Sequence, residues 1–342
     1  TGSSTGTTTR ATAIGVSAMA TDVEATALGT NAQATGTQSL AIGEDSVASG
    51  IDSSALGNNA DATAAQSTAV GRAAQATGTF STSLGYAADA SGSHSVAVGD
   101  RATASTGGSI AIGGDGADAG LTGALASGLT AIAIGEDASA TGEDSVAIGS
   151  LTKATAQRAT AVGRRANAPV LQSTALGYLA TSNGVSGVAV GDSSSVSGLA
   201  GIAIGQNAAS QQQASISIGR FSDATTEGAI ALGGDGADAG TAGAQATGLN
   251  AISIGVDSVS SGITSVAVGP AAVASDDEAT AIGGGANAVA NATSLGNQAN
   301  ASVLGAIAVG RLAAASGTDA IAVGTGSAAS GSNSLALGSG SD

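Results

Sequence analysis

The chain has 342 residues, including 55 Gly but only two Phe, two Tyr, no Trp and no Cys. Aromatic side chains therefore cannot fill a globular core, and disulfides cannot close one. The formal net charge is −16, with nine Lys and Arg against 25 Asp and Glu, which disfavours binding to nucleic-acid phosphates. A hydrophobic fraction of 42% that is regularly spaced excludes a disordered coil.

Residues 1–10 precede the first repeat and are predicted to form a flexible segment, followed by a single domain over residues 11–342. Within that domain a glycine closes a recurring phrase, as in SVAVG at residues 95–99. We call each such residue a marker glycine. The fixed phrase predicts a repeated structural unit.

The marker glycines recur with a 14-residue period. They run from Gly15 to Gly113, from Gly135 to Gly233 and from Gly255 to Gly338, with two gaps of 22 between the runs. The step that ends at Gly296 is shorter than the others by one residue. A fixed period this short indicates a solenoid with one coil per repeat.

Each coil is predicted to contain two short strands. The residue before the marker is always Ile, Leu or Val, the residue two positions earlier is aliphatic, Thr or once Ser, and the residue between them is Ala or Ser. This alternation has the period of a strand. A second small alternation follows the marker, as at Ala102 and Ala104. The marker glycine relaxes one corner, and a second glycine such as Gly92 or Gly142 often lies at the other.

A single coil offers little burial. Its two large aliphatic side chains are worth about 1.5–3 kcal/mol each when fully buried, whereas ordering the backbone costs about 1–2 kcal/mol per residue. The Ala and Ser positions form a uniformly small face that another flat surface could approach closely. We therefore expect a homo-oligomer with the Ala/Ser face as its interface.

Two loop expansions interrupt the period, near residues 114–128 and 234–248. The phrases are GGDGADAGLTGALASG from Gly113 and GGDGADAGTAGAQATG from Gly233, and their likeness indicates duplication of a block of coils. Because the flanking strands keep their pattern, we expect the extra residues at a corner.

The phrase GGDGADA also fits the start of a calcium-binding nonapeptide. Its ligands would be Asp115 and Asp118, or Asp235 and Asp238. The apolar position that should follow is glycine in both copies, and calcium rolls need adjacent copies. We therefore predict glycine-rich loops and no metal site.

No catalytic or cofactor site is predicted. The single histidine, His94, excludes histidine clusters, and the absence of Cys excludes thiol nucleophiles. His94 is expected at a solvated corner. The acidic groups Glu44–Asp45 and Asp276–Glu278 are interpreted as charge on solvated turns, and the column after the marker mixes acids with Arg and Tyr, as a solvent-facing corner does. The sequence singles out no ligand-binding residue.

Ice binding through a threonine array is a less favoured alternative. Thr occupies the position three before the marker in some coils, but Ile, Leu or Val occupies it in 14 others, so Thr is interpreted as a β-branched filler. These threonines are Thr12, Thr26, Thr68, Thr82, Thr160, Thr174, Thr280 and Thr293.

The repeated SVAIG and SVAVG phrases over residues 11–338 resemble the YadA-like head repeats of trimeric autotransporter adhesins. The resemblance implies an all-β fold, a left-handed parallel β-roll of 14-residue turns with two strands each, in which three chains associate side by side. It also implies the head of a bacterial surface fibre, anchored in the outer membrane through a C-terminal region absent here.

The expected function is attachment to extracellular matrix protein, host cells, other bacteria or abiotic surfaces by multivalent, non-catalytic contacts. A passive spacer of a surface fibre is the main alternative. Some heads of this family bind collagen through phrases like NSVAIG, which only NSLALGSGS at Asn333 approaches here.

Overall fold

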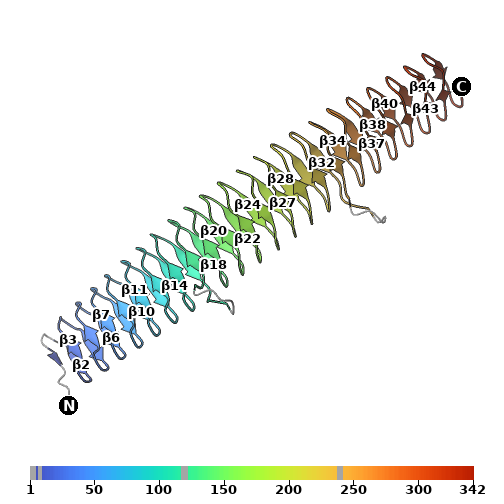
Figure 1. The fold of residues 1–342 in the computed structure, drawn as a ribbon. Helices are drawn as coiled ribbons and strands as arrows, with labels where there is room; N and C mark the ends of the chain where they lie inside the picture. Colours follow the sequence, from blue (N-terminus) through green and yellow to red (C-terminus); the bar gives the residue numbers. More distant parts are fainter. Residues whose placement is uncertain (1–4, 7–9, 117–121, 237–241) are drawn as a thin grey trace. The chain divides into compact units, whose positions relative to one another are not determined.

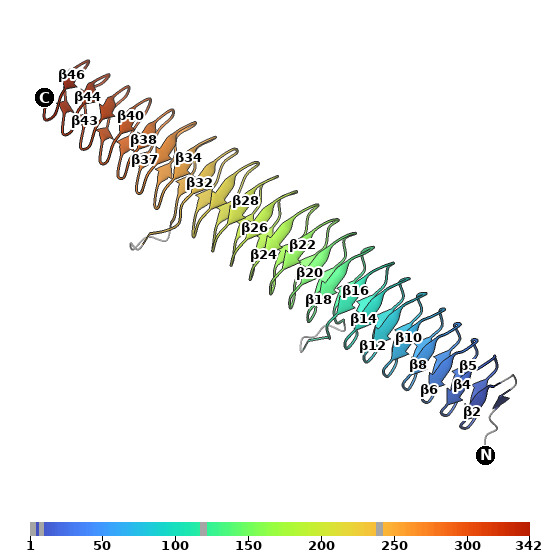
Figure 2. The same ribbon diagram turned by 180° about the vertical axis from the view of Figure 1, so that it is seen from behind.

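The computed structural model describes residues 5–6, 10–116, 122–236 and 242–342, and these contain strands, turns and bends. The chain divides into two compact units, Thr1–Gln172 and Ser173–Asp342. Unit 1 holds β1 (Thr5–Gly6) to β23 (Asn167–Ala168), and unit 2 holds β24 (Thr174–Leu176) to β46 (Leu335–Leu337). Each unit is a parallel β-solenoid of short coils (Figures 1 and 2).

The marker glycine fixes the bounds of both strands in each coil. Every even-numbered strand is the three residues before a marker, as in β14 (Val96–Val98) before Gly99. The odd-numbered strands from β3 onward are the fourth and fifth residues after a marker, as in β15 (Thr103–Ala104). The exceptions lie within the two 22-residue gaps and are β17 (Leu125–Ala126) and β33 (Gln245–Ala246). The prediction of two strands per 14-residue coil is confirmed.

Successive coils pair in parallel, and in each unit the even-numbered strands form one sheet and the odd-numbered strands another. Val96 of β14 lies opposite Ile110 of β16 (Ile110–Ile112), the equivalent position of the next coil. The backbone hydrogen bonds between successive coils continue at the corners that connect the strands. There the Gly99 N–H donates to the Leu84 carbonyl at 2.8 Å. Each coil thus hydrogen-bonds to its neighbours along its backbone.

The 22-residue gaps leave this register intact. Ile110 of β16 lies opposite Ile132 of β18 (Ile132–Ile134), although the first loop expansion separates them in the sequence. The described backbone leaves the roll after Gly113 and rejoins it at Ala124, whose N–H donates to the Gly113 carbonyl at 3.1 Å. The strand β17 then begins inside the range 114–128 that the sequence assigned to the expansion.

The second gap has the same construction. The Ala244 N–H donates to the Gly233 carbonyl at 2.9 Å, so the extra residues again leave the roll just after a marker glycine. In Figures 1 and 2 the described ends of both expansions extend away from the coils. Residues 117–121 and 237–241 lie outside the described part of the chain.

The 13-residue step shortens the opposite corner. Four residues, 289–292, connect β39 (Asn287–Ala288) to β40 (Thr293–Leu295), and Thr280 still lies opposite Thr293. The Ala292 N–H closes this corner on the Val289 carbonyl at 2.9 Å. We call the turn that begins at the marker glycine the marker corner, and the turn before the next even-numbered strand the second corner. The roll therefore tolerates a deletion at the second corner and insertions at the marker corner.

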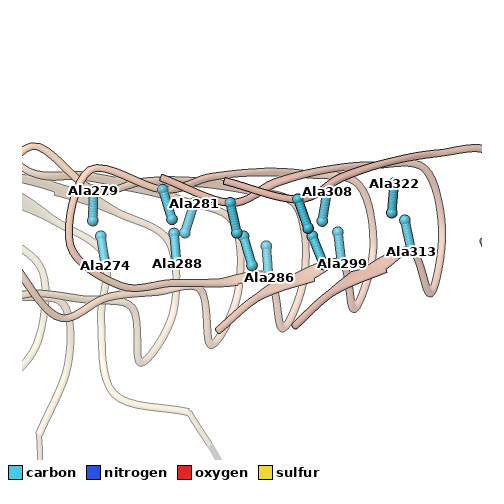
Figure 3. Packing of buried hydrophobic residues seen from close by; sticks show 14 of the residues in the cluster. Ala274, Ala279, Ala281, Ala286, Ala288, Ala299, Ala308, Ala313 and Ala322 are labelled. Carbon is cyan, nitrogen blue, oxygen red and sulfur yellow. The ribbon is translucent and has the colours of Figure 1, made fainter. Parts of the chain in front are cut away.

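The core between the two sheets is made of alanine and serine. Figure 3 shows alanines of unit 2 from both sheets pointing toward one another, among them Ala281 of β38 (Thr280–Ile282) and Ala288 of β39. Four positions per coil point inward, as at Ser95, Ala97, Ala102 and Ala104, which are fully buried. Some inward serines satisfy their hydroxyls locally, as Ser95 Oγ donates to the Gly92 carbonyl at 2.6 Å, whereas Ser39 Oγ and Ser81 Oγ are buried without a hydrogen-bond partner.

The prediction that the Ala/Ser face is an intermolecular interface is wrong. The two sheets of a 14-residue coil lie back to back, and inward side chains recur at about 4.8 Å along the roll. A gap this narrow accepts a methyl or hydroxymethyl group, so the small face is the interior. The branched aliphatic side chains consequently lie outside and are not buried within one chain.

The marker glycines are required by close approach and by conformation. Gly99 has φ of 133°, and a Cβ there would lie 2.6 Å from the Gly113 carbonyl oxygen. At the second corner a Cβ on Gly142 would lie 1.9 Å from the Ala156 carbonyl oxygen. The predicted role of glycine at both corners is confirmed.

Candidate functional surface

The first and third residues of the even-numbered strands form an aliphatic face on each unit. In β20 (Val146–Ile148) the middle residue Ala147 is fully buried, whereas Ile148 is 37% exposed. The exposed aliphatic members are Ile14, Leu28, Leu84, Ile112 and Ile148 in unit 1, and Ile204, Ile218, Ile254, Ile282, Leu295, Val323, Leu335 and Leu337 in unit 2. Branched side chains at about 4.8 Å spacing make a continuous apolar surface, which is typical of a protein-contact site.

The threonines that were weighed as an ice-binding array lie on this same face. Ser54, Thr68 and Thr82 follow one another in register, and Val96 takes the next place. Thr160 likewise lies opposite Val146. The hydroxyl rows are therefore short and interrupted by aliphatic side chains, in agreement with threonine as a β-branched filler.

The marker corner carries arginine and aromatic side chains. Tyr86 is 43% exposed and lies between the Arg72 and Arg101 guanidinium groups, at 5.5 and 5.6 Å from its ring centroid. In unit 2 the Arg220 guanidinium lies 5.0 Å from the Phe221 ring centroid. The predicted solvent-facing character of this corner is confirmed, and cation–π contacts link neighbouring coils there.

The first aspartate in each copy of the calcium-like phrase pairs with arginine. Asp115, with 7% of its side chain exposed, accepts a hydrogen bond from Arg101 Nη1 at 2.5 Å. This hydrogen bond raises the pKa of the Arg101 guanidinium. The equivalent Asp235 pairs with Arg220. An arginine charge thus compensates the carboxylate that would otherwise serve a cation.

The arginines reach these aspartates from different positions. Arg101 is the second residue after its marker glycine and Arg220 is the first. Each loop also donates a backbone N–H to an aspartate on the next coil, from Gly116 to Asp137 Oδ1 at 3.3 Å and from Gly236 to Asp257 Oδ1 at 3.0 Å.

The proposed calcium ligands Asp118 and Asp238 lie outside the described residues. Within the described ranges, no three or more His, Asp or Glu side chains gather closely enough to hold a metal ion.

His94 lies at the second corner, as predicted. Its side chain is exposed, its ring stacks on Phe80 of the preceding coil at 4.9 Å between centroids, and Nδ1 lies 2.9 Å from Ser93 Oγ. No carboxylate is among these partners, so the arrangement resembles surface packing and not a catalytic pair.

The paired carboxylates hydrogen-bond to neighbouring coils. Asn31 Nδ2 donates to Asp45 Oδ1 at 2.9 Å, and Asn58 Nδ2 donates to Glu44 Oε2 at 3.4 Å. At the second corner the Ile263 N–H donates to Asp277 Oδ1 at 2.8 Å. These acids lie on exposed turns, where they bridge successive coils.

Two aspartates on the odd-numbered strands were not singled out by the sequence. Burial raises the pKa of Asp61 and of Asp223 above the ordinary value. Asp61 lies between Val47 and Gln75 in register, and its Oδ1 is buried without a hydrogen-bond partner. Asp223 receives a hydrogen bond from Gln211 Nε2 at 3.0 Å, which lowers its pKa in part. Both aspartates occupy the outward-facing position of their strands, so the sequence pattern did not indicate that they are partly buried.

The collagen-like phrase occupies the last coil. Asn333 adopts a positive φ of 56° at the second corner, and Leu335 and Leu337 of β46 are 60% and 62% exposed. The apolar side chains of this phrase thus belong to the aliphatic face.

Comparison with known families agrees with this geometry. Across the described residues, no helix is long and apolar enough to cross a membrane. No individual curated protein sequence matches the chain. The family model described as the YadA head domain repeat (2 copies) matches residues 9–32, 34–60, 62–88, 90–115, 126–152, 154–180, 182–208, 212–235, 246–270, 260–286, 290–313 and 315–341. The chain therefore belongs to the YadA head family, whose members are non-catalytic heads of trimeric surface adhesins.

Proposed function

We propose that this chain forms the head of a homotrimeric bacterial adhesin. It attaches the cell to extracellular matrix protein, host cells, other bacteria or abiotic surfaces. The observation that carries the proposal is the aliphatic face, which recurs coil after coil in a chain built of YadA head repeats. The fibre is anchored in the outer membrane, and the rolls are left-handed, as in the family.

The aliphatic face is the surface that three chains bury against one another. Ile282, for example, is 37% exposed in a single chain and lies between Val268 and Leu295 on adjacent strands. Completing the burial of such side chains in every coil supplies the hydrophobic stabilisation that the alanine core lacks. Trimer formation therefore adds to the stability of each folded chain.

The assembly is tested by light scattering on the purified chain. We expect the mass of three chains over a range of concentrations, because the aliphatic face recurs from coil to coil in both units. A stable single-chain mass at all concentrations contradicts the proposed trimer.

Attachment relies on many weak contacts and not on one deep site. The chain has only four Phe and Tyr residues and no Trp, so it lacks the aromatic anchors of a typical hot spot. Repeated coils on three chains present the same surface many times, which raises avidity without high affinity at any one contact.

Attachment is tested by displaying the complete fibre on non-adherent cells, with residues 11–338 present or replaced by an unrelated spacer of equal length. We expect adhesion to matrix proteins or abiotic surfaces to require the head. Equal attachment by both fibres would establish the passive spacer. Thermal hysteresis of the purified head would instead establish ice binding, which the interrupted threonine rows disfavour.

A further inference from the structure

Two corners border the aliphatic face in every coil. The marker corner consists of the marker glycine and the residues up to the next odd-numbered strand, and the second corner connects that strand to the following even-numbered strand. We propose that the second corner is the edge at which one copy packs against the next in the trimer, while the marker corner stays open to solvent. This inference rests on the proposed trimer.

The loop expansions exclude close packing at the marker corner. Both begin directly after a marker glycine, Gly113 in unit 1 and Gly233 in unit 2. Their described ends extend away from the coils (Figures 1 and 2). A neighbouring roll placed against this corner would meet them. The only 13-residue step falls instead at the second corner, where a shorter connection suits a crowded edge.

The second corner carries a row of exposed aliphatic side chains. All occupy the position six residues before a marker glycine, and they are 37–56% exposed. The row comprises Val23, Ile51, Leu129 and Leu171 in unit 1, and Val185, Leu199, Leu249, Ile263 and Leu304 in unit 2. Some are direct neighbours, since the Ala200 N–H donates to the Val185 carbonyl and the Thr264 N–H to the Leu249 carbonyl. This row widens the aliphatic face toward one side.

Arginine is distributed unevenly between the two corners. Of the nine Lys and Arg residues, those at marker corners are Arg72, Arg101, Arg164, Arg165, Arg220 and Arg311, whereas only Arg10 and Arg158 lie at second corners. The marker corner also exposes apolar side chains such as Tyr86 and Val256, but these are interspersed with arginines and acids. Acidic residues occur at both corners, among them Asp144 and Asp276 at second corners. The assignment therefore rests on the loop expansions and the aliphatic row, and not on charge.

Single cysteines test the assignment, because the chain contains none of its own. Leu199→Cys places a thiol at the second corner, and Asp192→Cys places one at the marker corner of the same coil. We expect maleimide labelling of Leu199→Cys in the native assembly to be at least tenfold slower than in the urea-unfolded chain. Asp192→Cys should label at a similar rate in both states.

The outcomes separate the corner assignment from the trimer itself. Light scattering on each variant reports whether trimers form. A trimer with equal labelling rates, or with Asp192→Cys protected instead, overturns the corner assignment and leaves the trimer intact. Single-chain mass for every variant and for the parent chain overturns the proposed assembly.

Charge substitution supplies a second readout. Leu199→Asp should lower the urea concentration at which the trimer dissociates, because a carboxylate at the packed edge loses its water. Asp192→Lys, in the same coil, should leave that midpoint unchanged. A loss caused by Asp192→Lys and not by Leu199→Asp contradicts the proposal.

Discussion

At the scale of single residues, one core position departs from the alanine rule. Val196 is the largest fully buried side chain among the described residues. It is accommodated because glycine occupies the neighbouring inward positions, where a Cβ on Gly187 or Gly201 would lie 2.8 or 2.9 Å from Val196 Cγ1. Other coils place Ser or Ala at the positions of these glycines, as at Ser95 and Ala131. The extra volume of the Val196 side chain is thus offset by the missing side chains of the two neighbouring glycines.

This compensation is tested with a double-mutant cycle. Gly187→Ser should reduce the free energy of unfolding by about 1–3 kcal/mol, because the new side chain overlaps Val196. The same change in a Val196→Ala background should cost much less, since the methyl groups are gone. Chemical denaturation measures both. Equal costs in the two backgrounds would show that the glycine serves another purpose.

The partly buried Asp61 gives a pH-dependent prediction. Burial raises its folded-state pKa above the unfolded value of 3.8, so its ionisation opposes folding and stability falls as pH rises through this range. Asp61→Asn should therefore raise the melting temperature at pH 7, and the gain should vanish at pH 3, where the aspartate is protonated in both states. Scanning calorimetry at the two pH values measures this.

Asp319→Asn, at an exposed corner, is the matched control. It removes the same charge without relieving burial and should change the melting temperature less at pH 7. A larger gain from Asp319→Asn would assign the effect to net charge instead.

At the scale of the element, each strand divides its residues between an inner and an outer function. In β38, Ala281 is fully buried between the sheets, while Ile282 is 37% exposed. The inner residue must be small enough for the two sheets of the coil to pack against each other. The outer residue contributes little within one chain and is available to a second copy.

Substitutions at these adjacent positions should separate folding from assembly. Ala281→Leu should destabilise the roll by about 1–3 kcal/mol or prevent folding, because the gap between the sheets has no room for it. Ile282→Ala should preserve the β-sheet circular dichroism and weaken only the trimer, as judged by mass at low concentration. A folded Ala281→Leu variant of full stability would contradict the inward assignment.

At the scale of the whole molecule, duplication has placed the same loop phrase in both units, yet each unit anchors it differently. Asp115 pairs with Arg101 and Asp235 pairs with Arg220, which occupy different places relative to their marker glycines. Recurrence of the ion pair from two positions indicates that compensation of the aspartate charge, and not one particular arginine site, is what each loop requires.

Because these arginines pair with the loop aspartates, we expect the thermal stability of the protein not to depend on calcium. Excess EDTA should leave the melting temperature within about 1 °C of that in millimolar CaCl₂, because a guanidinium already compensates each carboxylate. A chelator-induced fall of several degrees, restored by Ca²⁺, would assign a calcium site to the expansions. Arg101→Gln serves as the control that removes the compensating charge from one loop.

Most of the fold follows from the sequence because the repeat is strictly periodic. The marker glycines define the coil and its two strands, and both were predicted from the residue pattern and its spacing. The family followed from the same phrases. No ligand-contacting residue could be predicted in this way, because the chain has no catalytic or metal-binding motif and its outer columns vary from coil to coil.

The direction of the strand faces was decided only by the tertiary structure. An alternation such as Val96, Ala97, Val98 defines two faces but does not say which one is inside. Hydrophobicity favours the larger side chains for the interior, yet the two sheets of so short a coil approach too closely to admit them. Steric exclusion therefore places Ala97 inside and leaves the valines outside, where their burial requires another chain.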